Sequence, residues 1–185
     1  MSTLQTFLMD RVSSPLGTIL LVCDDEGRLR ALDFDDHDAR MRRLLRLHYG
    51  AGGHTLLAGR APDTLKTPLD AFFTGELGAV DAIAVRTAGT AFQRRVWAAL
   101  RDIPAGTTMT YSQLATAIGQ PSASRAVGLA NGANPVGIVV PCHRVIGADG
   151  SLTGYAGGVE RKRWLLAHEQ KWSSLAMGPN VGVSA

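Results

Sequence analysis

The segment 141–145, which reads Pro-Cys-His-Arg-Val, holds the residue types in this chain that are best suited to covalent chemistry. It directly follows the apolar run 138–140, which predicts a buried strand. Proline has no N–H to give to a neighbouring strand, so it is expected to end this strand and to hold Cys142 at its mouth. A free cysteine is usually only a small buried hydrophobe. A neighbouring His or Arg, however, favours the nucleophilic thiolate, so Cys142 is predicted to be reactive.

The other cysteine and several histidines do not suggest further chemistry. Cys23 lies in the apolar run 19–23 and is predicted to belong to the core. Two thiols do not make a disulfide framework. The sequence shows no apolar signal segment and no apolar run of about 18 residues, so the protein is expected to be soluble and cytoplasmic. His37, His48 and His54 lack the short spacings of metal ligands, so neither a metal site nor a cofactor is predicted.

The formal net charge of +3 is unevenly distributed along the 185 residues. Residues 1–88 carry 10 Lys and Arg against 12 Asp and Glu, whereas residues 89–185 carry 9 against 4. A basic second half joined to a slightly acidic first half indicates that the second half faces a polyanion.

The first half combines strand patterns with helix patterns. Strands are expected at 19–23 and 29–34, joined by a turn at 24–27. Helical spacing of apolar residues covers 39–49, with Asp36 or Asp38 available as a cap, and 64–73. The stretch 79–87 fits either a strand or a linker. A domain boundary is therefore expected near residue 88.

The second half is marked by two capping boxes, Thr90 with Gln93 and Thr110 with Gln113, each of which predicts the start of a helix. Ser122 is available to cap a third helix that continues to about residue 133. Two short helices joined by a tight turn are typical of a helix-turn-helix. The last of them is rich in small side chains, which fits close packing against a neighbour and also a recognition helix from which Arg125 projects.

The chain beyond the cysteine segment is expected to form a hairpin, a loop and one more helix. Residues 145–146 and 151–153 flank the turn 147–150, and a glycine-rich loop covers 154–158. The final helix is expected at about 159–169. Residues 171–185 lack periodicity and are rich in Ser and Gly, which predicts a mobile tail.

In this order, these elements resemble the O6-alkylguanine-DNA alkyltransferases, also called methylated-DNA–protein-cysteine methyltransferases. The resemblance covers roughly residues 90–169, with a weaker match at 14–17 in the first half. The stretches that carry it are Phe92-x-x-x-Val96-Trp97, Ile103-Pro104-x-Gly106, Tyr111-x-x-Leu114-Ala115, Arg125-Ala126-Val127-Gly128, Asn134-Pro135, the segment 141–145, Gly154-Tyr155-x-Gly157-Gly158 and Leu165-Leu166-x-x-Glu169. It implies an α+β protein with a ribonuclease-H-like domain at 1–88, a winged-helix-like DNA-binding and alkyl-acceptor domain at 89–170, and the tail 171–185.

The resemblance also implies a mechanism, which is direct-reversal DNA repair with one turnover per molecule. Cys142 takes the alkyl group from O6 of guanine, and by analogy also from O4 of thymine, because displacement at carbon needs a soft nucleophile. His143 is implied to draw the thiol proton through a water while Glu169 orients the imidazole. Asn134 is implied to be the hinge that joins the recognition helix to the cysteine strand. No cofactor is implied, and the thioether product has no route back to a thiol.

The implied partner is double-stranded DNA that contains O6-alkylguanine, approached from the minor groove and with the base flipped out of the stack. Binding by a monomer is implied, and cooperativity along DNA stays open. Arg125 would fill the vacated stack. The implied pocket residues are Tyr111, Val145, Tyr155 and Ala156, and the residues implied to approach DNA, besides Arg125 and Tyr111, are Ala123, Ala126, Gly128 and Ala130.

Two other classes of function fit parts of the sequence. A cysteine-dependent hydrolase could pair Cys142 with His143 or His168, but the helix-turn-helix and the basic half would then have no role. A non-catalytic helix-turn-helix DNA-binding protein would explain the basic half and leave the thiol without one.

Overall fold

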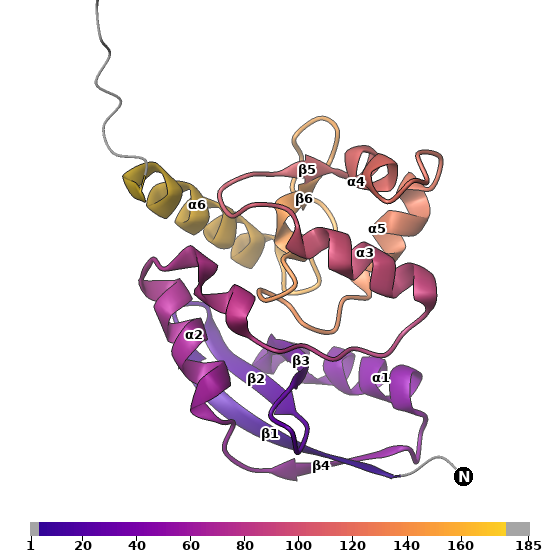
Figure 1. Ribbon diagram of the computed structural model, residues 1–185, viewed down its shortest axis with the longest axis vertical. Helices are drawn as coiled ribbons and strands as arrows, with labels where there is room; N and C mark the ends of the chain where they lie inside the picture. Colours follow the sequence, from indigo (N-terminus) through magenta and orange to yellow (C-terminus); the bar gives the residue numbers. More distant parts are fainter. Residues whose placement is uncertain (1–3, 177–185) are drawn as a thin grey trace, which may run out of the picture.

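The computed structural model of the protein describes residues 4–176. Two halves of the chain are stacked on one another: a sheet with two helices, and a mainly helical half (Figure 1). The predicted α+β class is confirmed. Within the described residues, no helix combines the length and the apolar character that crossing a membrane requires.

The first half is built on a four-stranded sheet with the strand order β3-β2-β1-β4. Its strands are β1 (Gln5–Ser14), β2 (Gly17–Cys23), β3 (Leu29–Phe34) and β4 (His54–Ala58). The first three are antiparallel neighbours, and β4 runs parallel to β1. The expected strands at 19–23 and 29–34 are confirmed. The sequence patterns do not indicate β1 and β4, because most side chains of these two strands are only half-buried or exposed.

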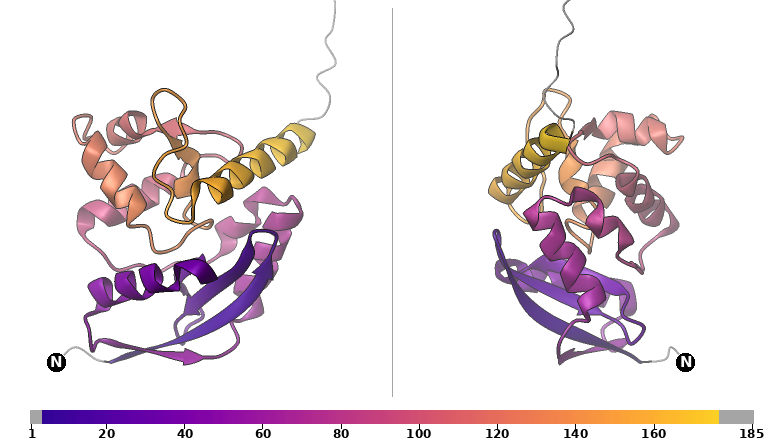
Figure 2. Two further views of the ribbon diagram at one scale, coloured as in Figure 1. Left: turned by 180° about the vertical axis from the view of Figure 1, so that it is seen from behind. Right: turned by 60° about the vertical axis from the view of Figure 1, so that its left-hand side comes forward.

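Two helices cover the opposite faces of this sheet (Figure 2). They are α1 (Asp38–Tyr49) and α2 (Asp63–Thr74), both close to the predicted ranges. Leu20 and Val22 of β2 pack with Met41 and Leu45 of α1. The alternate β2 residues join α2 and the second half in one large core, whose members from β2 and α2 are Ile19, Leu21, Cys23, Leu65, Leu69 and Phe72. Because both faces are covered, the run 19–23 is apolar at every position.

The predicted cap of α1 is wrong. The residue before this helix is His37, which makes no side-chain capping bond. Asp36 lies in a short 3-10 turn, and Asp38 is the first helical residue, where a negative charge suits the positive end of the helix dipole.

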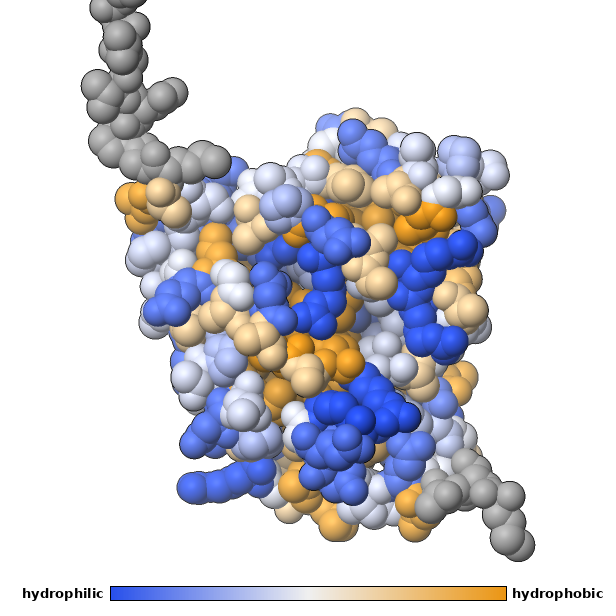
Figure 3. Space-filling model, viewed as in Figure 1, coloured by the Kyte–Doolittle hydropathy of each residue, from blue (hydrophilic) through white to orange (hydrophobic). Residues whose placement is uncertain are grey.

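The stretch 79–87 is mostly a linker. A 3-10 helix, η2 (Leu77–Ala82), is followed by extended chain in which Val85 makes a single bridge to Leu29 of β3. In Figure 3 a hydrophobic strip reaches the surface between the two halves on this face, with hydrophilic residues above and below it.

The second half begins with α3 (Ala91–Arg101) and continues with α4 (Tyr111–Ala117) and α5 (Ser124–Gly132). Both predicted capping boxes are present, at Thr90 with Gln93 and at Thr110 with Gln113. α4 and α5 pack on one another as the expected helix-turn-helix. The predicted cap Ser122 is wrong, since α5 starts after Ala123 without a side-chain cap.

Three further expectations for the second half are wrong. The hairpin does not form, because β6 (Val145–Ile146) pairs in parallel with β5 (Met109–Thr110), and 151–153 is not a strand. The last helix, α6 (Val159–Ala176), continues beyond residue 169. Residues 171–176 of the expected tail are therefore helical, and residues 177–185 lie outside the described part of the chain.

The expected strand at 138–140 is also wrong, and this error concerns the site. The segment is a tight series of turns in which Val140 N–H donates to the Val136 carbonyl at 3.0 Å. Ile138 adopts a φ of 67°, which a β-branched residue rarely takes. The run is apolar because it is enclosed by the core on all sides, so its composition reports burial and not a strand.

Candidate active site

Cys142 is the first residue of a short 3-10 helix, η3 (Cys142–Arg144), and not the end of a strand. Its side chain is almost enclosed, with 6 % of the residue exposed. Asn134 fixes the turns that lead to it: its Nδ2 donates to the Val140 carbonyl at 2.8 Å, and its Oδ1 accepts from Val136 N–H at 2.9 Å. The predicted hinge residue therefore does brace the cysteine segment from the side of α5.

Residues of the first half of the chain also bond the turns that lead to Cys142. Leu32 of β3 donates its N–H to the Pro135 carbonyl at 2.9 Å and accepts from Gly137 N–H at 3.0 Å. Arg40 of α1 pairs with Asp33 at 2.6 Å and donates to the carbonyls of Gly132 and Asn134. Sequence reasoning does not find Arg40, because the two carbonyls to which it donates lie more than 90 residues away.

His143 and Glu169 meet in the core with His143 Nε2 2.7 Å from Glu169 Oε1, and neither residue is exposed. Burial alone would raise the pKa of Glu169, but its hydrogen bonds with His143 and Arg144 and the charge of Arg144 outweigh burial and lower the pKa to about 2. Glu169 is therefore a carboxylate at neutral pH and can only accept hydrogen bonds. The hydrogen between the two residues must then sit on His143 Nε2.

The other ring nitrogen of His143 has the properties of a base. Burial lowers the pKa of His143 more than Glu169 raises it, so the imidazole is neutral at pH 7. With its hydrogen on Nε2, the neutral ring keeps a lone pair on Nδ1. Nδ1 is buried and has no hydrogen-bond partner among residues 4–176. The site thus contains an oriented imidazole next in sequence to the thiol, with its basic nitrogen unused.

Arg144 completes the environment of the carboxylate, and sequence reasoning does not assign it this role. Its guanidinium donates to both oxygens of Glu169 at 2.9–3.2 Å and to the Ile103 carbonyl at 2.6 Å. Gly106 N–H adds a bond to Glu169 Oε2 at 3.1 Å. Through Ile103 and Gly106, the segment 103–106 therefore bonds Arg144 and Glu169 and helps to fix the carboxylate.

Nearby polar and cationic groups favour the Cys142 thiolate, but burial outweighs them. Burial raises the pKa of the Cys142 thiol, and the opposing effects of Asn134, Arg40 and Lys162 do not offset it. Arg144 is committed to Glu169, and His143 is neutral. Cys142 is therefore a protonated thiol at rest, and its nucleophilic form requires removal of the proton.

Two of the four expected pocket residues, Tyr155 and Ala156, line the cavity at the thiol, and this cavity is nearly closed. The cavity that Cys142 borders together with Tyr155 and Ala156 has a volume of about 10 Å³, which is about the size of a single water. Tyr155 lies edge-on to His143, with ring centroids 6.5 Å apart. A group larger than a water can reach the thiol through this cavity only if its lining moves.

The segment 153–157, which closes the pocket, is held by two side chains at one carbonyl. Tyr111 OH donates to the Thr153 carbonyl at 3.2 Å, and Lys162 Nζ donates to the same oxygen at 3.1 Å. Lys162 also donates to the Val145 carbonyl at 2.5 Å and is fully buried. A lysine on a helix usually reads as a surface residue, so its sequence gives no hint of this role.

α5 divides into a face packed against the core and an exposed face. Arg125 and Ala126 are exposed, while Gly128 and Ala123 are partly exposed. An added Cβ at Gly128 would lie 3.7 Å from the ring of Tyr111. The assignment of Ala130 to the DNA-facing set is wrong. It is 2 % exposed and faces α3, where its carbonyl accepts from Trp97 Nε1 at 2.8 Å.

His168 does not belong to the site. It is buried between α6 and α2, where its Nε2 bonds the Phe72 carbonyl at 2.8 Å and its ring stacks on Trp164 at 4.7 Å. The hydrolase that would pair Cys142 with His168 is therefore not supported.

The geometry and the comparisons with known proteins lead to the same class. Residues 91–171 match the family model described as 6-O-methylguanine DNA methyltransferase, DNA binding domain, and residues 8–87 match its ribonuclease-like domain. A methylated-DNA–protein-cysteine methyltransferase of Salmonella typhimurium is 51 % identical over 162 residues, which is 88 % of this chain and 95 % of the relative. One from Methanosarcina acetivorans is 42 % identical over 166 residues, or 84 % and 94 % of the two chains.

A solved structure extends this likeness to three dimensions. The crystal structure of Mycobacterium tuberculosis OGT in complex with DNA has a TM-score of 0.72 at 38 % identity, covering 90 % of this chain and 94 % of the other. A buried cysteine beside a neutral histidine, in a DNA-binding domain that is joined to a ribonuclease-like domain, defines a class of DNA-repair alkyltransferases. The chain belongs to the 6-O-methylguanine DNA methyltransferase family, and its function is the transfer of a methyl group from methylated DNA to a cysteine of the protein itself.

Proposed function

We propose that Cys142 is the acceptor and that His143 and Glu169 activate it. The observation that carries this proposal is the bond of His143 Nε2 to Glu169 at 2.7 Å, which leaves Nδ1 as the basic nitrogen. In the reaction the thiol proton passes toward Nδ1 through a water, and sulfur attacks the alkyl carbon on O6 of guanine. The S–C bond forms as the C–O bond breaks, and O6 keeps the electron pair of the broken bond. The guanine anion then takes up a proton at N1, so that overall one proton has moved from the thiol to the base.

Each molecule acts once. The product is a thioether, and a thiolate is a poor leaving group from carbon in water. Within residues 4–176 the second thiol, Cys23, is buried in the core of the first half, and no bond connects it with Cys142. Transfer is thus stoichiometric and irreversible, and it consumes the protein.

The substrate is O6-alkylguanine in double-stranded DNA, with O4-alkylthymine as a second lesion. α5 approaches the minor groove with the exposed Ala126 and the partly exposed Ala123 and Gly128, and Tyr111 stands beside it. Arg125, exposed at the start of α5, replaces the flipped base in the stack. The base enters between Tyr111, Val145, Tyr155 and Ala156 after the segment 153–157 moves away.

The protein works as a monomer in the cytoplasm, with the chain divided near residue 88. The two family matches, which end at residue 87 and begin at residue 91, support this division. Among the proposed partners, DNA is the one that the relatives support best, because the M. tuberculosis structure contains DNA.

Intact-mass measurement after reaction with a duplex that contains one O6-methylguanine tests the acceptor. We expect one added methyl group per chain, and peptide mapping should place it on Cys142. Cys23→Ala is the matched control and should still gain one methyl group, whereas Cys142→Ala should gain none. Label on Cys23, or more than one methyl per chain, would exclude Cys142 as the sole acceptor.

A further inference from the structure

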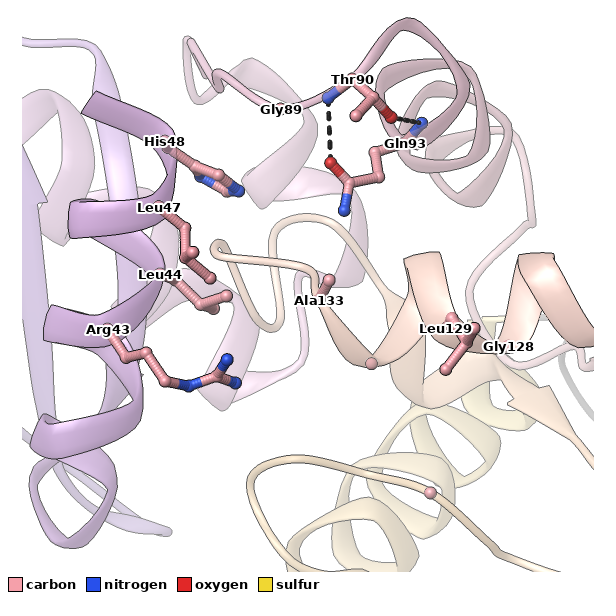
Figure 4. A pocket seen from close by; sticks show the side chains of 12 residues that line it. Arg43, Leu44, Leu47, His48, Gly89, Thr90, Gln93, Gly128, Leu129 and Ala133 are labelled. Carbon is pink, nitrogen blue, oxygen red and sulfur yellow. Dashed lines mark hydrogen bonds between the residues drawn. The ribbon is translucent and has the colours of Figure 1, made fainter. Parts of the chain in front are cut away.

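A hollow of about 780 Å³ opens beside α5, away from the cysteine, and the mechanism does not use it. α1 of the first half forms one wall and α5 forms the other, and the start of α3 closes one end (Figure 4). Residues of all three helices line it, together with Gly154 from the loop of the active site. The hollow is therefore an open trough between the two halves of the chain.

Arg43 supplies the charge of this hollow. In Figure 4 its side chain extends from α1 into the space that faces α5. Arg43 is exposed, and no acidic side chain among residues 4–176 pairs with it, although its neighbours Arg40 and Arg42 are both paired. No carboxylate lines the hollow, and burial lowers the pKa of its one histidine, His48, below the usual value. The permanent charge of the hollow at neutral pH is thus that of one arginine.

The opposite wall is the flank of the proposed recognition helix. Gly128 and Gly132 of α5 line the hollow without side chains, and Leu129 between them is 72 % exposed. A helix in a minor groove about 6 Å wide has one sugar-phosphate strand along each of its sides. A trough that runs beside α5, with a bare backbone on one wall and an unpaired cation on the other, has the shape and charge for one of these strands.

We propose that the hollow receives one sugar-phosphate strand of the bound duplex and that Arg43 contacts a phosphate of this strand. The ribonuclease-like half then takes part directly in DNA binding and does more than support the cysteine segment. The inference rests on the proposed use of α5, and it assigns the strand to the α1 side of that helix. A phosphate contact of this kind positions the protein without reading sequence.

Arg43→Ala tests the proposal, with Arg42→Ala as the matched control. Arg42 is on the same helix and carries the same charge, but it pairs with Asp38 and does not line the hollow. For each protein, the rate on a methylated duplex is divided by the rate with free O6-benzylguanine on the same preparation, so that effects on cysteine chemistry cancel. Duplex affinity is measured over a series of salt concentrations.

For Arg43→Ala we expect duplex affinity to fall by roughly threefold to tenfold, and the rate ratio at subsaturating DNA to fall by the same factor. The slope of log affinity against log salt concentration should flatten by about 0.9, because one phosphate contact is lost. Arg43→Lys should keep the wild-type slope, and Arg42→Ala should stay within about twofold of wild type. Equal small effects of the two alanine variants would overturn the proposal and would leave a protein or peptide as occupant of the hollow. Failure of the wild type itself to react with either substrate would instead refute the proposed function.

Discussion

Replacing Glu169 by glutamine is the sharpest test of the active-site argument, because it preserves shape and removes only charge and acceptor capacity. The carboxylate accepts hydrogen bonds from His143, from Arg144 and from Gly106 N–H, so both of its oxygens face donors. An amide has one oxygen and one NH₂ group. One side of the substituted side chain must therefore point a donor at another donor.

Arg144 donates to both oxygens, so one of its N–H groups faces the NH₂ group in either orientation of the amide. If the amide oxygen takes the place of Oε2, which bonds Gly106, the NH₂ group also faces His143 Nε2, and His143 is the one donor here that can become an acceptor. The imidazole can accept this bond only by moving its hydrogen to Nδ1, which is the nitrogen that has to receive the thiol proton. The variant thus stabilises the wrong tautomer, and we expect the single-turnover rate to fall by about 10² to 10⁴, the range known for loss of a positioned general base or its orienting carboxylate.

Stability should fall by an amount that follows from the same contacts. The pKa of Glu169 lies at about 2 in the folded protein, against about 4.3 in an unfolded chain, so the interactions that favour the charged form contribute about 3 kcal/mol. The folded pKa is the lower one, so this stabilisation is complete above the unfolded pKa of about 4.3 and is lost as pH falls toward 2. Glu169→Gln should lower the free energy of unfolding at pH 7 by about this amount and should flatten its dependence on pH in the acid range.

The assays are single-turnover transfer from a methylated duplex and urea unfolding between pH 3 and pH 7. Glu160→Gln, at the exposed start of the same helix, is the control and should change neither quantity appreciably. A Glu169→Gln protein that unfolds more easily but transfers methyl within a fewfold of the wild-type rate would refute the tautomer argument. It would leave Glu169 with a structural role alone.

Two further results are expected. Arg125→Ala should slow repair of duplex DNA far more than reaction with free O6-benzylguanine, and the loss should be smaller when the lesion lies opposite a mismatch, because extrusion then costs less; equal losses on all three substrates would favour a simple phosphate contact. Because burial lowers the pKa of His143, the transfer rate should stay level as pH falls to the ordinary imidazole value of about 6.5 and should decline only below it; a rate that halves at or above that pH would contradict a neutral, buried base.

Local signals in the sequence predict the structure well where the interactions themselves are local. The capping boxes at Thr90 and Thr110 are formed by residues three positions apart, so the pattern contains the whole interaction. The apolar run 138–140 is different, because apolar composition reports enclosure by a core and does not distinguish a strand from buried turns. Ile138 lies between Val136 and Val140, whose backbone groups Asn134 bonds, and nothing in a β-branched residue indicates its positive φ.

The candidate site shows the same limit over longer distances. Cys142, His143 and Asn134 could be named from the sequence because they stand in or near one segment whose resemblance is specific. Arg144 stands in that segment too, but its function depends on Glu169, 25 residues away, and on the Ile103 carbonyl. Ala130 is assigned to the wrong face of its helix because small side chains allow both DNA approach and helix packing, and only the position of Trp97 decides between them.

The protonated, enclosed state of Cys142 also bears on oxidation. Attack on peroxides and on disulfides proceeds through the thiolate, and it needs access to the sulfur. With 6 % of the residue exposed and burial raising the pKa of its thiol, Cys142 should react slowly with both. For an ordinary catalyst such side reactions would cost only a fraction of its turnovers. For a protein that reacts once, each oxidised cysteine is a lesion left unrepaired, so a thiol that stays protonated and enclosed until the substrate binds preserves the repair capacity of the protein.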